Sequence, residues 1–209
     1  MITITNEDCM DLMARYPDKH FELAIVDPEY GNEKIFNGSA DYANKHKQYK
    51  NIAPSNDYFF KLFRMSQNQI IWGGNYFSLP PSRGWVIWDK IRYVENYSRY
   101  ELAYTSFDVH PKCFEYCNNA GFIAADLDKP KIHPSQKPVA LYKWLLKNYA
   151  KPGDKILDTH LGSGSIAIAC HDAGYDLTAC EIDKDYYEAA MKRLRQHQAQ
   201  FNLFEKETA

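Results

Sequence analysis

The chain has 209 residues, a formal net charge of −2, and hydrophobic side chains at 45% of its positions. This length suits one α/β domain with a sizeable buried core, and no apolar run approaches the length of a membrane span. Its five cysteines lack the spacing of zinc ligands. We therefore expect reduced thiols, no metal site and a cytoplasmic protein.

The N-terminal segment predicts a short strand at residues 2–5 and one or two helical turns at residues 9–13. Asp8 lies directly before these turns, where its side chain suits a helix N-cap. Because the strand leads straight into a polar stretch, we expect no signal peptide.

The most informative segment follows a short apolar run at residues 21–26, which indicates a buried strand. Asp27, Pro28 and Tyr30 then lie at the carboxyl end of that strand, where open α/β sheets place their ligands. Asp27 and a neighbouring main-chain carbonyl can accept two N–H bonds from a planar base that carries an amino group, and Tyr30 offers a face for stacking. The alternative is a strand that ends in a proline turn, with Asp27 as a turn former.

Residues 32–55 are polar and weakly periodic, and loops of this length in compact domains are usually functional or disordered. We expect a mobile loop beside the active site. Basic residues in and after this loop indicate contacts with phosphates, although ordinary solvated side chains are the alternative. The candidates are Lys34, Lys45, Lys47, Lys50 and Arg92.

Amphipathic and apolar runs predict a helix at residues 57–66 and strands at residues 69–74, 85–90 and 100–106, the first of which ends in a turn. Their apolar character predicts a central sheet that is buried on both faces. Most of the aromatic rings here are expected in the core, namely Trp72, Tyr76, Phe77, Trp85 and Trp88.

The C-terminal half predicts a helix at residues 138–149 and then a strand, a glycine-rich turn, a helix and a second strand. These four elements are expected at residues 155–158, 159–165, 166–173 and 177–181. Glycines in such a turn let the backbone approach a ligand closely. Glu181 closes the second strand at about the distance at which such units hold a pair of ribose hydroxyls.

The turn also fits a dinucleotide fingerprint, but Asp158 beside it would repel phosphates and suits a ligand with an ammonium group. S-adenosylmethionine has such an ammonium, a ribose and no phosphate. A tight turn without a ligand is the alternative, and a dehydrogenase is the least favoured interpretation.

Together with residues 133–138 (HPSQKP), these segments resemble the S-adenosylmethionine-dependent amino-methyltransferases of DNA, which methylate adenine N6 or cytosine N4. Residues 27–30 (DPEY) resemble the family's D-P-P-Y motif, and residues 158–164 resemble its cofactor loop. The catalytic motif comes first and H-P-x-Q-K-P lies between the two, which is the order of the permuted beta class. The resemblance covers residues 2–194.

The resemblance implies a Rossmann-like, doubly wound, mostly parallel sheet of about seven strands with helices on both faces. One strand between residues 72 and 106 would be antiparallel, and the catalytic motif and cofactor loop would end adjacent central strands. The chain would form a single methyltransferase domain, 1–209, in four parts. These are a catalytic half (1–106) with the mobile loop 32–55, a short target-recognition insert (107–132), a cofactor-binding half (133–195) and a polar, frayed tail (196–209).

In the family pattern, the Asp27 carboxylate and the Pro28 carbonyl would accept the hydrogens of the base amino group, and Tyr30 would stack on the flipped base. Asp8 would accept from the adenine of the cofactor, as an alternative to its N-cap role. The residues that the resemblance assigns to the cofactor site are Asp8, Cys9, Asp27, His133, Ser135, Gln136, Lys137, Asp158, His160, Leu161, Gly162, Ser163, Gly164, Ser165, Glu181 and Ile182.

Two features depart from the family pattern. Glu29 stands where the motif usually has proline, and the recognition insert is little more than a loop. The leading Asp27 favours adenine N6, with double-stranded DNA as the partner; a homodimer and a companion restriction enzyme are compatible with that function. The alternatives are a cytosine-N4 enzyme, an RNA or small-heterocycle methyltransferase, and a catalytically impaired DNA-binding relic.

Overall fold

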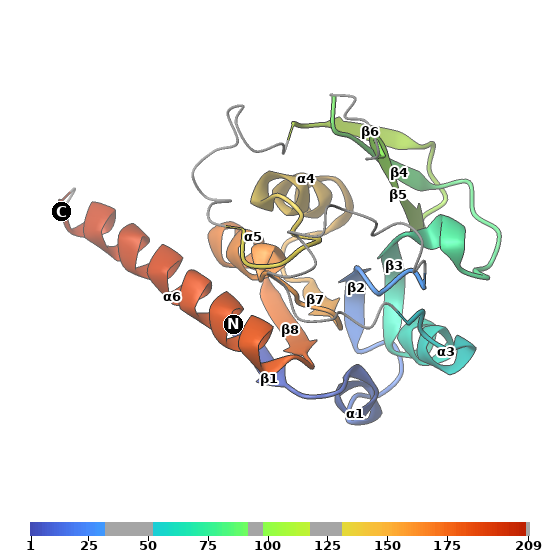
Figure 1. Cartoon of the computed structure of the whole chain (residues 1–209), viewed down its shortest axis with the longest axis horizontal. Coiled ribbons are helices and arrows are strands. Elements are labelled where there is room, and N and C mark those ends of the chain that lie inside the picture. Colours follow the sequence, from blue (N-terminus) through green and yellow to red (C-terminus); the bar gives the residue numbers. More distant parts are fainter. Residues whose placement is uncertain (32–51, 92–97, 118–130, 208–209) are drawn as a thin grey trace, which may run out of the picture.

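An eight-stranded sheet forms the centre of the described residues in this computed structural model (Figure 1). The structure describes residues 1–31, 52–91, 98–117 and 131–207, with side chains up to residue 200. The strands are β1 (Ile2–Asn6), β2 (Phe21–Val26), β3 (Ser66–Trp72), β4 (Trp85–Asp89), β5 (Tyr100–Thr105), β6 (Lys112–Glu115), β7 (Lys155–Asp158) and β8 (Asp176–Glu181). The helices are α1 (Cys9–Ala14), α3 (Asn56–Met65), η1 (Gly74–Tyr76), α4 (Val139–Tyr149), α5 (Ser165–Ala173) and α6 (Lys184–Glu207).

The strand order is β1-β8-β7-β2-β3-β5-β4-β6, and β5 is antiparallel to both of its neighbours while the other described pairs are parallel. The predicted mostly parallel, doubly wound sheet with one antiparallel strand is therefore confirmed. Strands β2 and β7 are hydrogen-bonded neighbours, with Leu23 opposite Ile156 and Ala24 opposite Leu157. The segments that follow these two strands consequently start from the same edge of the sheet.

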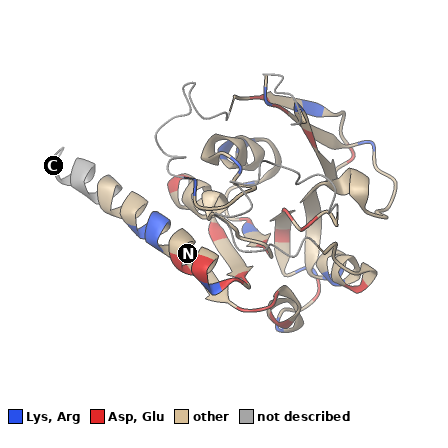
Figure 2. Cartoon of the chain, in the orientation of Figure 1, with Lys and Arg blue, Asp and Glu red and all other residues tan. Residues whose placement is uncertain are grey.

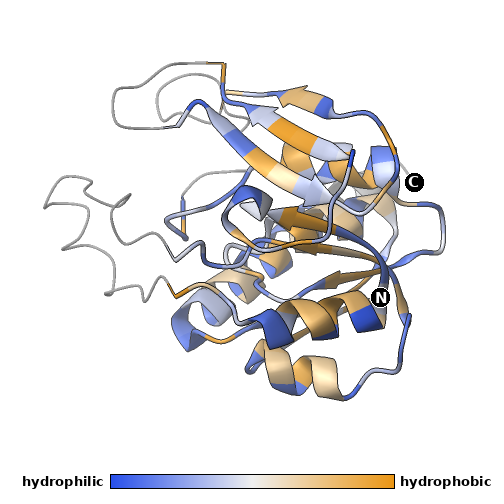
Figure 3. Ribbon diagram, turned by 90° about the vertical axis from the view of Figure 1, so that its right-hand side faces the viewer, coloured by the Kyte–Doolittle hydropathy of each residue, from blue (hydrophilic) through white to orange (hydrophobic). Residues whose placement is uncertain are grey.

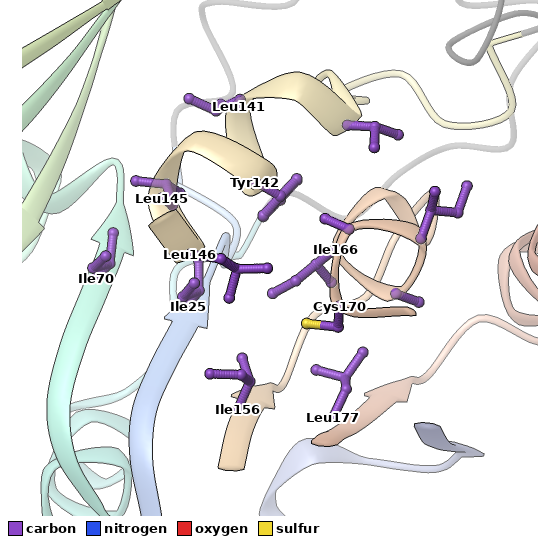
Figure 4. Close-up of a cluster of buried hydrophobic side chains, with 14 of the residues drawn as sticks. Ile25, Ile70, Leu141, Tyr142, Leu145, Leu146, Ile156, Ile166, Cys170 and Leu177 are labelled. Carbon is purple, nitrogen blue, oxygen red and sulfur yellow. The ribbon is translucent and has the colours of Figure 1, made fainter. Parts of the chain in front are cut away.

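Helices α4, α5 and α6 cover one face of the sheet, and α1 and α3 cover the other (Figure 1). Apolar side chains fill both interfaces, and the apolar strands run through the middle of the molecule while the helices carry polar residues outside (Figure 3). The larger core cluster includes Ile25, Ile70, Leu145, Ile156 and Ile166 (Figure 4). Each fully buried aliphatic side chain of this kind contributes about 1.5–3 kcal/mol to folding.

Three predictions about local structure were wrong. The sheet has one strand more than expected, because β6 forms inside the predicted recognition insert 107–132 and pairs in parallel with β4. Tyr76 is not in the core, since it belongs to the turn η1 and is 46% exposed. Residues 196–207 continue α6 as a helix, because His197 packs against the body with its Nε2 atom 2.6 Å from Oδ1 of Asp172.

Several predicted residues lie outside the described part of the chain. They include most of the loop 32–55, much of the insert 107–132, and the candidate phosphate contacts Lys34, Lys45, Lys47, Lys50 and Arg92. Within the residues that the structure describes, none of the helices has the length and apolar character needed to cross a membrane.

Candidate active site

A cavity of about 520 Å³ opens at the carboxyl ends of the central strands. Most of the residues that the sequence assigned to the cofactor line it, namely Asp8, Cys9, Asp27, His133, Ser135, Gln136, Lys137, His160, Leu161, Gly162, Ser163, Glu181 and Ile182. The lining also contains residues that the sequence did not indicate, namely Glu7, Glu29, Ile52, Tyr142 and Thr159. Asp158, Gly164 and Ser165 belong to the predicted set but are not part of the lining.

Acidic side chains are frequent in this lining. Glu7 and Asp8 follow β1, Asp27 and Glu29 follow β2, and Glu181 ends β8. Figure 2 shows acidic residues between β1 and α1 and at the start of α6, beside the same edge of the sheet. A cavity with this many carboxylates favours a cationic ligand over a phosphate.

The segment before α4 forms a tight turn that closes one side of the cavity. The Gln136 amide donates to the His133 carbonyl at 3.2 Å, and the Ser135 hydroxyl is 3.0 Å from His133 Nδ1. The His133 ring also packs edge-on against Tyr186 of α6, with centroids 4.4 Å apart. These contacts fix the turn, and through it the position of Lys137.

Glu181 is held at the end of β8 by two backbone amides. Its Oε2 atom accepts from Gly162 at 2.8 Å, and its Oε1 atom accepts from Asp183 at 2.9 Å. Burial raises the pKa of this carboxyl above its ordinary value, although both hydrogen bonds act in the opposite direction. Gly162, at φ +51°, therefore bends the loop around the same carboxylate that lines the cavity.

Gly164 serves the packing of the loop more than the cavity. It is the N-cap residue directly before α5 and has φ +74°, and a Cβ atom there would meet the Cβ of Ala190 on α6 at 3.1 Å. We expected the glycines of this turn to let the backbone approach a ligand. For Gly164, the close neighbour in the structure is instead another helix.

Asp158 lies beneath the loop and is only 2% exposed. Its Oδ1 atom accepts from the His160 amide at 2.9 Å. Burial raises the pKa of Asp158 to about 8, with further contributions from the nearby carboxylates of Asp27 and Glu181. The prediction that this carboxylate faces a ligand ammonium therefore stays a prediction.

Tyr30 and Asp27 form a hydrogen-bonded pair at the end of β2. The Tyr30 hydroxyl donates to Asp27 Oδ1 at 2.8 Å, and the Lys137 ammonium donates to Asp27 Oδ2. The Tyr30 ring stacks on Tyr76, with centroids 5.2 Å apart and planes 20° apart. It also packs closely on the backbone of Gly73, so the stacking face expected for a ligand already has a protein neighbour.

Glu29 belongs to the cavity and contacts the cofactor loop. Its Oε2 atom is 3.7 Å from Nε2 of His160. Burial lowers the pKa of His160 below its ordinary value, although the negative charges of Glu29 and Asp27 act in the opposite direction. The residue that departs from the family motif therefore bridges the ends of β2 and β7.

Several of the described basic residues that follow the loop 32–55 in the sequence already have acidic partners. Lys61 contacts Asp57 at 3.1 Å, and Arg83 contacts Asp108 at 2.9 Å. The other pairs are Lys90 with Glu101 and Arg99 with Asp89. A DNA-contacting surface built from basic side chains thus stays a prediction.

The pKa of Asp158 leads to a prediction about stability. The ordinary pKa of this carboxyl is 3.8. Above that pH, Asp158 of the unfolded chain releases its proton, whereas the folded chain retains the proton up to a pH of about 8. The stability due to this proton is therefore fully present below 3.8 and is lost as the pH rises toward about 8. Asp158→Asn keeps an oxygen that can accept from His160 and does not titrate. Between these pH values, the melting temperature should fall more steeply with pH for the wild type than for Asp158→Asn. Parallel falls in the two proteins would contradict the raised pKa of Asp158.

Comparison with known proteins identifies the family of this chain. Residues 2–192 match the sequence model of the DNA methylase family N6_N4_Mtase. The type II methyltransferase M.HpaI of Haemophilus parainfluenzae is 36% identical over 75 residues, and the DNA adenine methyltransferase YhdJ of Escherichia coli (strain K12) is 37% identical over 71 residues. These segments cover 36% and 32% of this chain but only 23% of each relative.

Solved structures share the fold at low sequence identity. The M1.HpyAVI–SAM complex has a TM-score of 0.59 and 18% identity, covering 93% of this chain and 100% of that chain. The PvuII DNA methyltransferase, which is cytosine-N4-specific, has a TM-score of 0.62 and 12% identity, covering 96% and 91% of the two chains. Because the family model matches nearly the whole sequence, the chain belongs to the DNA methylase family.

Proposed function

We propose that this protein transfers a methyl group from S-adenosylmethionine to the exocyclic amino group of a flipped base in double-stranded DNA, and that the base is adenine. The observation that carries this proposal is that Asp27 and Glu181 line one cavity. Asp27 follows β2 and Glu181 ends β8, and these two strands flank β7 in the sheet. A carboxylate suited to a base amino group and a carboxylate suited to a ribose thus share one binding space.

The cavity fits S-adenosylmethionine in size and charge. Its volume of about 520 Å³ lies within the usual range for small-molecule sites. The carboxylates of Glu7, Asp8 and Glu29 favour a ligand with a sulfonium and an ammonium. Glu181 would hold the ribose hydroxyls, and Asp8 would accept from the adenine while it also caps α1 through the Met10 amide at 2.7 Å. When bound, this cofactor supplies an electrophilic methyl group.

Asp27 and Pro28 would activate the base. An exocyclic amino group is a weak nucleophile because its lone pair is delocalised into the ring. Two acceptors that hold its hydrogens, the Asp27 carboxylate and the Pro28 carbonyl, would localise this lone pair on the nitrogen. Tyr30 and Lys137 hold the Asp27 carboxylate before the base arrives, so positioning and electrostatics would provide most of the rate enhancement.

Tyr30 and Tyr76 would form the entrance for the flipped base. Their rings are 5.2 Å apart, which leaves no room for a base between them. Tyr76 is 46% exposed, and its turn η1 follows the end of β3. We expect the base to replace the Tyr76 ring on Tyr30, gaining a comparable aromatic stack.

The choice of adenine rests on the leading Asp27 of the motif and is supported by the relative YhdJ, which is named a DNA adenine methyltransferase. The cytosine-N4-specific PvuII neighbour favours the alternative base. Incubation with labelled S-adenosylmethionine and unmethylated genomic DNA, followed by nucleoside analysis, decides between them. N6-methyladenine is the expected product, and N4-methylcytosine would replace the proposal with its alternative. A cytoplasmic location, a homodimer and a companion restriction enzyme stay predictions.

Asp27→Ala should lower kcat by a factor of at least about 100, the scale of losing one fixed hydrogen-bonding group at a reacting centre. Cofactor affinity should change little, because the carboxylate acts on the base and not on the sulfonium. Asp57→Ala, which removes an exposed carboxylate on α3, is the matched control and should leave turnover unchanged. Turnover of the Asp27 variant at the wild-type rate would contradict the mechanism.

Gly73→Ala should displace Tyr30, because the added Cβ would lie 2.2 Å from Cε1 of its ring. Losing this stacking platform should weaken DNA binding by about 1–3 kcal/mol, the scale of one base–aromatic stack. Gly153→Ala is the control, since Gly153 also has a positive φ but nothing lies within 4 Å of the added atom. Equal effects of both variants on DNA affinity would show that the Tyr30 contact is not involved.

A further inference from the structure

A buried lysine contacts the carboxylate of the DPEY motif. The Lys137 side chain is 2% exposed, and its ammonium donates to Asp27 Oδ2. The same ammonium is 3.3 Å from Oε2 of Glu101 and 3.5 Å from the Tyr30 hydroxyl, and it lies 5.2 Å above the Trp72 ring. Lys137 itself follows the turn before α4. Residues at the ends of β2 and β3 and a residue of β5 therefore converge on its ammonium group.

All the donors of Lys137 are used within the protein. An ammonium has three N–H donors and no acceptor. Asp27, Glu101 and Tyr30 provide one partner for each donor. The side chain lines the cavity, but its charged end is directed at the carboxylate that would receive the base. Lys137 therefore has no N–H donor left for the carboxylate of the cofactor.

The charges around Lys137 balance. Asp27 and Glu101 supply two carboxylates, and Lys137 and Lys90 supply two ammonium groups, with Lys90 2.6 Å from Glu101. Burial opposes the charged form of Lys137, but Asp27 and Glu101 hold its pKa above the ordinary value. Burial likewise opposes ionisation of Glu101, but Lys137 and Lys90 hold its pKa below the ordinary value. Removing one member would leave an uncompensated charge in a partly buried cluster.

We propose that Lys137 is a positioning residue that holds the Asp27 carboxylate in the orientation needed for the base amino group, and that it is not a ligand of the cofactor. Lys137 and Tyr30 occupy one acceptor site on each oxygen of Asp27. A carboxylate has about four such sites, so about two are left for the base. The catalytic part of this inference rests on the proposed function. The other part, that the Lys137 ammonium pairs with Asp27 and not with the cofactor, does not depend on the proposed function.

The first experiment compares cofactor affinity with turnover. Lys137→Met keeps a long apolar side chain against Trp72 and removes the charge, while the exposed Lys147→Met on α4 is the matched control. Calorimetry with S-adenosylmethionine should show nearly unchanged affinity, and kcat should fall on the order of 100-fold. Lys137→Arg should recover part of kcat, because a guanidinium also pairs with carboxylates. Loss of cofactor affinity that matches the loss of kcat would overturn the proposal, as would wild-type kcat in Lys137→Met.

The second experiment needs no activity. Denaturant unfolding of Lys137→Met, Asp27→Asn and the double variant forms a cycle that isolates the coupling between the two residues. Lys137→Met should lower the unfolding midpoint clearly in the wild type and much less in the Asp27→Asn background. Equal shifts in both backgrounds would overturn the assignment of Lys137 to Asp27. If the wild type methylates no nucleic acid but this coupling is found, the proposed function fails and the assignment stands.

Discussion

The site depends on the parallel pairing of β2 with β7. These strands are far apart in the sequence, but Leu23 lies opposite Ile156 and Ala24 opposite Leu157. Because parallel strands end at the same edge, the DPEY motif and the cofactor loop start side by side. The pairing is stabilised from both faces of the sheet, by Ile25 and Ile156 under α4 and α5 and by Ala24 and Leu157 on the side of α1 and α3. A change in this register would separate the two halves of the proposed chemistry.

A second constraint is the placement of charge at this edge. Acidic groups line the cavity, and the cluster of Asp27, Glu101, Lys137 and Lys90 carries equal numbers of positive and negative groups. The antiparallel strand β5 matters here, because it supplies Glu101 to the neighbourhood of β2. Within the cluster, Lys137 and Lys90 hold the pKa of Glu101 below its ordinary value, although burial opposes its ionisation.

Much of this architecture is predictable from the sequence. Long periodic or apolar runs predicted α3, α4, β7 and β8 to within two residues, because core packing follows the same pattern that the sequence displays. The four-residue strand β6 is too short to show a period, and Tyr76 looks apolar although its turn places it at the surface. The motifs predicted most of the residues that line the cavity. They did not predict that Lys137 turns toward Asp27, that Gly164 packs on Ala190, or that Glu29 reaches His160. Such contacts join segments that are distant in sequence, so only the tertiary fold reveals them.

The most direct test of the account is a crystal structure of the protein with S-adenosylmethionine bound. The central claim is that one cavity places the methyl donor beside the carboxylate that receives the base. The account predicts the ribose at Glu181, the sulfonium between the ends of β2 and β7, and the methyl group directed toward Asp27. The Lys137 ammonium should remain on Asp27. A cofactor bound outside this cavity, or bound with its methyl group directed away from Asp27, would contradict the account.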